Sequence, residues 1–244
     1  MSDYKKDDKL FAKILDQIEY DINDNIPDGF AILHYEDGSC YKGSIQNGKR
    51  HGKGCFTGVN GSSYEGDFVE GNKHGKGCFT NVFGGFYEGD FVDDEMHGYG
   101  RLTYKNGNVY EGSWLNDERH GYGRFIKKDG DVYDGEWEND MMHGEGKMSC
   151  SDGSFYEGNW LKNNKHGKGT ECDTDGDLHK GKWINGSIGR HGLFFEVKTG
   201  CAYDADYVDN EMVRKYIRRG EVYYDRFFYK YNKKSIERLI KSKD

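Results

Sequence analysis

The feature that most constrains this chain is an internal repeat of 23 residues. Six tyrosines are each separated by 23 positions, and the next step falls on His179. These tyrosines are Tyr41, Tyr64, Tyr87, Tyr110, Tyr133 and Tyr156. A short repeat that keeps its phase predicts an array of supersecondary units, each of which buries its apolar face only against its neighbours.

Each repeat contains two segments in which apolar and polar residues alternate. In the first segment a tyrosine, a glycine and a second large apolar residue occupy alternate positions, as in Tyr110-Glu111-Gly112-Ser113-Trp114. A period of two places these three residues on one face of a β-strand. The second segment starts at a His-Gly-x-Gly sequence such as His120-Gly121-Tyr122-Gly123. The repeat therefore predicts a β-hairpin with one aromatic face and one charged face.

A turn dipeptide follows each second segment. These dipeptides are Asp37-Gly38, Asn60-Gly61, Asn106-Gly107, Asp129-Gly130, Asp152-Gly153 and Asp175-Gly176, with Phe83-Gly84 as the exception. Asn-Gly and Asp-Gly suit the two positive-φ positions of a type I′ turn, so we expect this turn here. Seven hairpins are predicted to start at residues 41, 64, 87, 110, 133, 156 and 179, after a half-repeat over residues 28–40.

The composition agrees with a thin sheet. Hydrophobic residues make up 34% of the chain and aromatic residues 15%, while glycines number 36. Burial therefore has to come from rings packed on bare backbone, since a thick aliphatic core is not available. The six cysteines include no CxxC pair, and Cys55 and Cys78 occupy the same repeat phase, so we expect reduced thiols.

Charge is spread unevenly along the chain. Residues 27–208 carry 20 basic and 30 acidic side chains, whereas residues 209–244 carry 11 basic and 6 acidic ones. An acidic centre repels phosphate backbones and anionic lipid, which argues against nucleic acid as a partner. No leader and no apolar run long enough to span a bilayer is visible, so we expect a cytoplasmic chain that is neither secreted nor transmembrane.

The two ends of the chain depart from the repeat. Residues 1–27 contain apolar residues at helical spacing, from Leu10 to Ile18, and predict an amphipathic helix that caps or occupies the array, or contacts a partner or lipid. After Trp183 the repeat decays: two extra residues precede His191-Gly192, and Phe194 replaces the second glycine. Residues 209–244 are predicted to form a mixed cap, with a helical or mixed piece near residues 212–219. The repeat array is thus expected over residues 28–208.

The run from Tyr110 to Gly123 resembles the MORN (membrane occupation and recognition nexus) repeat, and the resemblance covers about residues 28–208. It implies an elongated, single-layer antiparallel sheet with a groove along one face. It also implies scaffold or adaptor roles at membrane–cytoskeleton junctions or ciliary structures. MORN arrays can precede catalytic domains, but the tail after residue 208 is too short for one, so we expect no enzyme activity.

The aromatic face is the candidate site for a protein partner such as a helix or an extended peptide. Rings resting on glycines are compatible both with a core and with the floor of a partner-binding groove. The candidate groove residues are Tyr64, Phe68, Tyr87, Phe91, Tyr110, Trp114, Tyr133, Trp137, Tyr156, Trp160 and Trp183.

Three chemical alternatives fail on spacing. The repeated His-Gly histidines lie about 10 Å apart in successive hairpins, too far to share one zinc ion, and we expect each to hydrogen-bond the turn beside it. No phosphate-binding GxxxxGK[ST] sequence occurs. Asp173, Asp175 and Asp177 resemble the start of a calcium loop, but Leu178 stands where that loop needs glycine. We therefore expect no metal and no cofactor.

The leading hypothesis is a non-enzymatic scaffold that binds a protein partner through the aromatic groove. Such a scaffold could also form a homodimer. The alternative is a peripheral phospholipid-binding module that acts through the basic tail. The candidate residues for an anionic-membrane contact are Arg214, Lys215, Arg218, Arg219, Lys233, Lys234 and Arg238. In the first hypothesis the same residues form an ordinary solvated surface.

Overall fold

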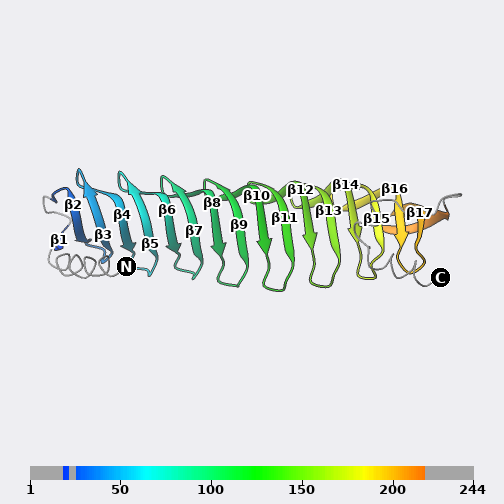
Figure 1. The fold of residues 1–244 in the computed structure, drawn as a ribbon, viewed down its shortest axis with the longest axis horizontal. Helices are drawn as coiled ribbons and strands as arrows, with labels where there is room; N and C mark the ends of the chain where they lie inside the picture. The colour runs from blue at the N-terminus through cyan, green and yellow to red at the C-terminus, as the bar shows by residue number, and fades with distance from the viewer. Residues whose placement is uncertain (1–18, 22–25, 218–244) are drawn as a thin grey trace, which may run out of the picture. The chain divides into compact units, whose positions relative to one another are not determined.

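The computed structural model describes residues 19–21 and 26–217, and every regular element in that part of the chain is a β-strand (Figure 1). The chain divides into two compact units, residues 1–118 and 119–244. The first unit contains β1 (Glu19–Asp21), β2 (Gly29–His34), β3 (Cys40–Gln46), β4 (Lys49–Thr57), β5 (Ser63–Val69), β6 (Asn72–Thr80), β7 (Phe86–Val92), β8 (Glu95–Thr103) and β9 (Val109–Leu115). The second contains β10 (Glu118–Ile126), β11 (Val132–Glu138), β12 (Met141–Ser149), β13 (Phe155–Leu161), β14 (Asn164–Cys172), β15 (Leu178–Ile184), β16 (Ser187–Glu196), β17 (Cys201–Val208) and β18 (Glu211–Ile217).

Within each unit the strands form an open antiparallel sheet in which each strand pairs with the next along the chain. The register repeats: Gly43 faces Gly54, and Gly66 faces Gly77. The all-β, antiparallel, single-layer prediction is confirmed. β1 is an exception, since it pairs with β2 in parallel and covers that edge of the first sheet. The helix predicted near residues 10–18 lies outside the described residues.

The pair of positive φ angles expected at the Asp-Gly and Asn-Gly turns lies at the other end of each hairpin. The pair of positive φ angles lies between the two strands of a repeat, as at Asn47 (52°) and Gly48 (71°). At the Asp-Gly end only the glycine has a positive φ, for example Gly38 at 88°. There the N–H of Gly38 donates to the carbonyl of Tyr35 at 2.9 Å, and the Tyr35 N–H donates to the Ser39 carbonyl at 3.0 Å.

This second pattern is a type I turn followed by a glycine bulge, so the type I′ assignment at the Asp-Gly and Asn-Gly dipeptides was wrong. The physical reason is a local hydrogen bond. The Asp37 carboxylate accepts from the backbone N–H of Ser39 at 2.8 Å, as Asx turns do, and Asn60 does the same with Ser62 at 3.0 Å.

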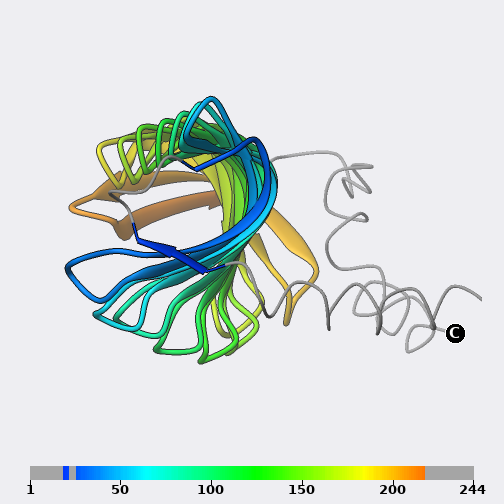
Figure 2. The same cartoon turned by 90° about the vertical axis from the view of Figure 1, so that its left-hand side faces the viewer.

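The strands curl strongly, so the two ends of a hairpin turn toward the same side (Figure 2). On β4 the Arg50 guanidinium lies 5.1 Å from the ring centre of Phe56, six residues further along the strand. In a flat strand six residues span about 20 Å. The aromatic face must therefore be the inner side of the curl.

A column of tyrosines forms the core on this inner face. The Tyr41 hydroxyl donates to the carbonyl of Ser44 at 2.8 Å, and its ring covers the paired glycines 43 and 54. A Cβ on Gly54 would lie 2.3 Å from the Tyr41 hydroxyl oxygen, so no other residue fits there. Tyr64 also meets two large rings edge-on, Phe68 on its own strand β5 and Phe91 on β7, with ring centres 5.0 and 5.1 Å away.

The repeat continues further toward the C-terminus than predicted. Gly181 pairs with Gly192, as Gly158 pairs with Gly169, and His179 pairs with Phe194. Gly192 is therefore the second glycine of its repeat and no residues are inserted before it, which corrects the alignment on the His191-Gly192 dipeptide. The helical piece expected near residues 212–219 was also wrong, because Glu211–Ile217 form β18, paired with β17.

Candidate functional site

The aromatic residues expected to line a partner-binding groove are buried in the sheet. All eleven, from Tyr64 to Trp183, have exposed fractions of 5% or less. Cationic side chains cover several of these rings, with Lys73 Nζ 5.3 Å from the Phe91 ring centre and Arg119 Cζ 4.1 Å from that of Trp137. Two hollows that remain on this side of the first unit measure about 360 and 220 Å³. The rings belong to the core, and binding of a partner at them stays a prediction.

A larger open depression lies on the outer, charged face of the first unit. It measures about 1350 Å³ and we call it the glycine furrow. Its floor is the column of glycines 43, 54, 66, 77, 89 and 100. Its walls are formed by Phe30, Lys42, Lys53, Cys55, Glu65, Lys76, Cys78, Glu88, Tyr99 and Arg101.

The packing on the inner face explains the glycines in the floor of the furrow. The tyrosine rings demand glycine at the centre of each strand, because a Cβ on Gly77 would lie 2.4 Å from the Tyr64 ring. On the outer face these positions lie between two rows of outward-facing side chains, and they are bare there because a Cβ at each would point inward to the ring. The repeat pattern indicated the glycines beneath the rings but gave no sign of a depression on the outer face of the same column.

The walls of the glycine furrow carry both signs of charge. Lys53 Nζ lies 2.8 Å from the Asp67 carboxylate, and Lys76 Nζ lies 2.6 Å from that of Asp90. Burial opposes ionisation of Asp90, but hydrogen bonds from Lys76 and from the Tyr99 backbone N–H outweigh it and lower the pKa of that carboxyl. The lysines remain more than two-thirds exposed, so these pairs add little stability and stay accessible to a ligand.

The two furrow thiols are poor nucleophiles. Burial, followed by the negative charge of Glu65, raises the pKa of the Cys55 thiol. Burial and Glu88 do the same for Cys78. Since the thiolate is the reactive species, these cysteines favour a binding surface over covalent chemistry.

The second unit has a smaller furrow of about 790 Å³ at the equivalent positions of its repeats. Its lining includes Tyr122, Asp134, Glu145, Lys147, Glu157, Lys168, Thr170 and Lys180. Tyr122 donates a hydrogen bond to the Asp134 carboxylate across it. The lining contains no cysteine, which distinguishes it chemically from the furrow of the first unit.

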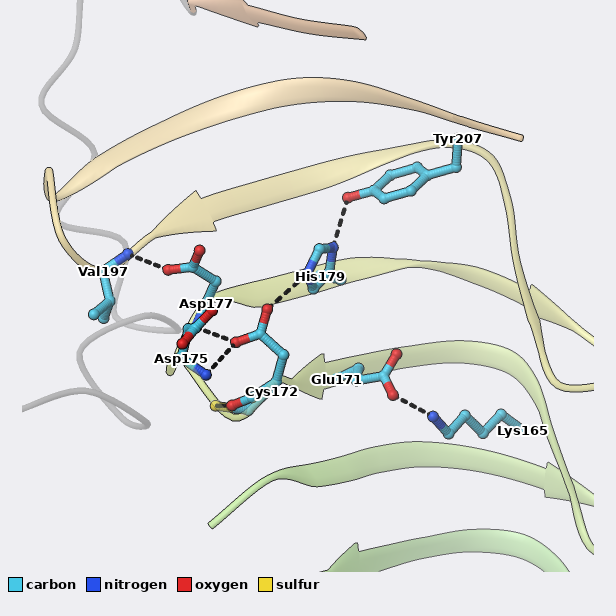
Figure 3. Close-up of polar contacts among 9 residues, drawn as sticks. Lys165, Glu171, Cys172, Asp175, Asp177, His179, Val197 and Tyr207 are labelled. Atoms are coloured by element: carbon cyan, nitrogen blue, oxygen red, sulfur yellow. Dashed lines mark hydrogen bonds and ion pairs between the residues drawn. The ribbon is translucent and has the colours of Figure 1, made fainter. Parts of the chain in front are cut away.

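His179 takes the place of the tyrosine in its repeat and belongs to a chain of polar groups (Figure 3). Its Nδ1 lies 3.2 Å from the Tyr207 hydroxyl, and its Nε2 lies 3.4 Å from the Asp173 carboxylate. Tyr207 is 2% exposed, and burial raises the pKa of its hydroxyl. The contact between His179 and Tyr207 links β15 to β17.

The Asp173 loop does not gather ligands for a cation. One carboxylate oxygen of Asp173 accepts from the backbone N–H groups of Asp175 and Asp177, at 3.0 and 2.9 Å. Asp177 accepts from the N–H of Val197 at 2.8 Å. Within residues 19–21 and 26–217, no three His, Cys, Asp or Glu side chains are placed to hold a metal ion.

The repeated histidines do not make the expected hydrogen bond through Nδ1. This atom is buried and without a hydrogen-bond partner in His51, His74, His97, His120, His143 and His166. In His143 this Nδ1 lies 3.0 Å from a Glu138 carboxylate oxygen, which is close enough for an ion pair when the ring is protonated, although the contact lacks the geometry of a hydrogen bond.

Only two residues of the predicted anionic-membrane contact lie in the described part of the chain. Lys215 Nζ lies 3.1 Å from the Glu196 carboxylate and 4.5 Å from the ring centre of Tyr203, so it is engaged within the second unit. Arg214 lies beside it on β18 and is exposed. Arg218, Arg219, Lys233, Lys234 and Arg238 lie outside the described residues. No helix found in the described residues is long and apolar enough to cross a bilayer.

Comparison with solved structures gives distant likenesses. The microcephaly protein CPAP G-box domain is 10% identical, with a TM-score of 0.48 over 79% of this chain and 100% of that one. The SAS-4 (dCPAP) TCP domain of Drosophila melanogaster, in complex with a proline-rich motif of Ana2, is 12% identical, with a TM-score of 0.39 over 64% and 86%. These likenesses are too weak to bear on function.

Sequence comparison settles the family. No curated protein matches the chain. The family model of the MORN repeat matches residues 41–63, 64–82, 87–109, 110–132, 133–155 and 156–178, which is more than half of the chain. The matched segments coincide with the hairpins that carry the tyrosine column and the glycine furrows. The chain belongs to the MORN repeat family.

Proposed function

We propose that this chain is a non-enzymatic scaffold that holds a protein partner in the glycine furrow of its first unit. The observation that carries the proposal is the furrow itself, a depression of about 1350 Å³ on a sheet whose other face is filled by its own rings. The setting implied by the family, a membrane–cytoskeleton junction or a ciliary structure, is part of the proposal.

The lining of the furrow suits a segment of polypeptide. Lys42, Lys53, Lys76 and Arg101 alternate with Glu65 and Glu88, so a partner with charges of both signs can pair along its length. Tyr99, 55% exposed, provides a ring with a polar tip at one end, of the kind that anchors protein interfaces. The floor of the furrow carries no outward-facing side chain, so a helix or an extended strand can approach the backbone between the two walls.

Site-specific photo-crosslinking tests this proposal. A benzophenone amino acid replaces Tyr99 in the full chain, and a matched variant carries it at Val92, which is 38% exposed at the acidic turn between β7 and β8. Irradiation in cells should join a protein to the Tyr99 variant and not to the Val92 variant. The partner identified this way is then purified for binding measurements.

The binding measurement has its own control. Replacing Lys53 and Lys76 by Glu reverses two furrow charges and should weaken the binding of the purified partner about tenfold or more. Replacing Lys147 and Lys168 by Glu makes the same change in the second furrow and should leave the affinity nearly unchanged. Equal effects of the two pairs, or no crosslink at Tyr99, would refute the assignment to the first unit.

A further inference from the structure

One glycine pair of the second unit is framed on the outer face by three lysines and a threonine. Gly169 on β14 pairs with Gly181 on β15, and a Cβ on either glycine would point inward. The residues that flank the two glycines therefore point outward. They pair in the same register, Lys168 with Lys182 and Thr170 with Lys180, and we call these four side chains the lysine square. Three of them line one end of the second furrow.

Equivalent squares surround the other glycine pairs between successive hairpins, but their charges differ. In the first unit Lys76 faces Asp90, with Nζ 2.6 Å from the carboxylate. In the second unit Lys147 faces Glu157 at 3.5 Å. Each of the five earlier squares has a net charge of zero or −1, whereas the lysine square has three positive charges and no negative one.

The positive charges of the lysine square are not balanced by their surroundings. Lys168 and Lys182 are exposed and directly opposite, and like charges in this arrangement destabilise a sheet. Neither forms an ion pair with a carboxylate in the described part of the chain. The acids on the neighbouring strands have other partners, since Lys147 lies beside Glu157 and a ring nitrogen of His191 lies 2.5 Å from Asp206. A bound anion would remove this repulsion.

Lys182 also gives up a hydrogen bond that other repeats make. At its position in the repeat, Asp67 accepts from the backbone N–H of Lys76 at 3.2 Å, and Asn159 accepts from that of Lys168 at 3.1 Å. An ammonium group can only donate, so a lysine cannot make this bond. The folding of the hairpin therefore does not explain Lys182, which indicates a role in binding.

We propose that the lysine square binds the phosphate group of a phosphorylated serine or threonine in a protein segment that lies along the second furrow. The corners of the square are about 5 and 7 Å apart, so the three lysines can reach one group. A phosphate monoester carries nearly two negative charges and several acceptor oxygens, which suits three ammonium groups better than one carboxylate does. Thr170, 3% exposed, places a hydroxyl at the fourth corner. This ligand is separate from the partner of the first furrow.

The rest of the second furrow favours a polypeptide over a lipid surface. Beyond the square, its walls carry Asp134, Glu145 and Glu157 beside Lys147, with Tyr122 at the far end. These acids would repel an anionic bilayer. A peptide can instead pair basic residues with them on one side of its phosphorylated residue. The proposal therefore also predicts basic residues near the phosphate in the ligand.

Binding of the full chain to two immobilised peptide libraries provides the test. One library has a central phosphoserine between varied residues, and the other has serine at that position. The test variant is Lys182→Asp, which introduces the residue type found at Asp67 and so suits the hairpin. The matched control is Lys198→Asp, which makes the same change of net charge at an exposed position between β16 and β17. Circular dichroism checks that both variants are folded.

The parent chain and the Lys198 variant should bind the phosphoserine library equally, and excess inorganic phosphate should compete with it. The Lys182 variant should bind this library about tenfold or more weakly, as should the parent chain on the serine library. Vesicles of phosphatidylcholine with about 10% phosphatidylinositol phosphate test the lipid source of the same group.

Three results would overturn the proposal. The first is a parent chain that does not bind the phosphoserine library or binds both libraries equally. The second is a Lys182 variant that binds as well as the Lys198 variant. The third is binding to the vesicles without binding to the phosphoserine library. None of these results depends on the crosslink at Tyr99, so the two furrows are tested separately.

Discussion

The tyrosine column and the loop apices belong to the same repeats but follow opposite rules. In the column, Tyr41 and Tyr156 occupy equivalent sites with the same hydrogen bond and the same glycines beneath the ring. At the apices, the glycine that closes the turn is retained while its neighbours change from Glu36-Asp37 to Val82-Phe83. The column positions accept only one residue type each, because the rings and the backbone fill all the space. The apices face solvent, so their residue types can vary.

Positions that are alike in every repeat form the fold, whereas positions that differ give single repeats their own properties. A position that every repeat must satisfy alike reports packing, so the column defines the fold. A position at which one repeat departs from its equivalents without a structural need reports a local role. On this basis the first unit, with its apolar apices and its thiol-lined furrow, is the more specialised of the two.

The largest effect should come from alkaline pH, which acts on the column. Burial raises the pKa of Tyr41 to about 12 and raises those of Tyr64, Tyr87, Tyr133 and Tyr156 as well. Below pH 10 the tyrosines are protonated in both the folded and the unfolded chain, so the free energy of unfolding keeps its full value. Above pH 10 the unfolded chain ionises first, so each tyrosine removes on the order of 1 kcal/mol by pH 11. Tyrosinate absorbance and circular dichroism should change together, and separate transitions would contradict burial of the column.

Filling the glycine column should destabilise the sheet by about 3 kcal/mol or more. A Cβ on Gly77 would lie 2.4 Å from the Tyr64 ring, so Gly77→Val forces the ring away from both glycines. Lys76→Val is the matched control on the same strand, because Lys76 is 71% exposed on the outer face and should cost less than about 1 kcal/mol. Urea denaturation measures both, and similar costs would mean that the rings do not hold the backbone.

Removing a column hydroxyl should have a smaller effect. The Tyr133 hydroxyl donates to the Glu136 carbonyl at 2.9 Å, so Tyr133→Phe leaves that acceptor short of a partner and costs about 1–2 kcal/mol. Tyr122→Phe removes a hydroxyl from a side chain that is 61% exposed and should change the unfolding free energy by about 0.5 kcal/mol at most. If urea denaturation ranks the two variants the other way, the column hydroxyls do not contribute to stability as their hydrogen bonds suggest.

The smallest effect on stability is expected at an apex. Phe83→Ser should change the unfolding free energy by about 0.5 kcal/mol or less, since the ring is 74% exposed. The same exchange at Phe68, 1% exposed, should cost about 3–5 kcal/mol. A large loss at Phe83 in thermal melts would show that the apex has a structural role, and would remove the contrast between the apices and the tyrosine column.

The sequence predicts the strands of the repeat well but does not predict which face of the sheet is accessible. The spacing of Tyr110, Gly112 and Trp114 was enough to predict strands, their register and the aromatic face, because period-two alternation has one physical meaning in a sheet. It was not enough to decide whether the rings line a groove or form a core. That depends on the curl of the strands, which brings Arg50 over Phe56 and closes the inner face.

Predictions from short motifs were wrong where a nearby side chain or a paired strand favours another structure. The Asp-Gly pairs predicted type I′ turns, but the Asp37 side chain binds the Ser39 N–H and holds a type I turn with a bulge. The His191-Gly192 dipeptide imitated the start of a segment, whereas strand pairing puts Gly192 opposite Gly181. The polar run near residue 212 suggested a helix, and the free edge of β17 makes it a strand.

The sequence by itself determined the repeat, its family, the strand pairing and the requirement for glycine beneath each tyrosine, since these follow from interactions within 23 residues and between adjacent copies. Only the tertiary structure decided which face is accessible. The curl of each strand buries the rings and leaves the outer face of the glycine column as a furrow. Curvature accumulates over many small backbone twists and bulges, so no single residue type encodes it.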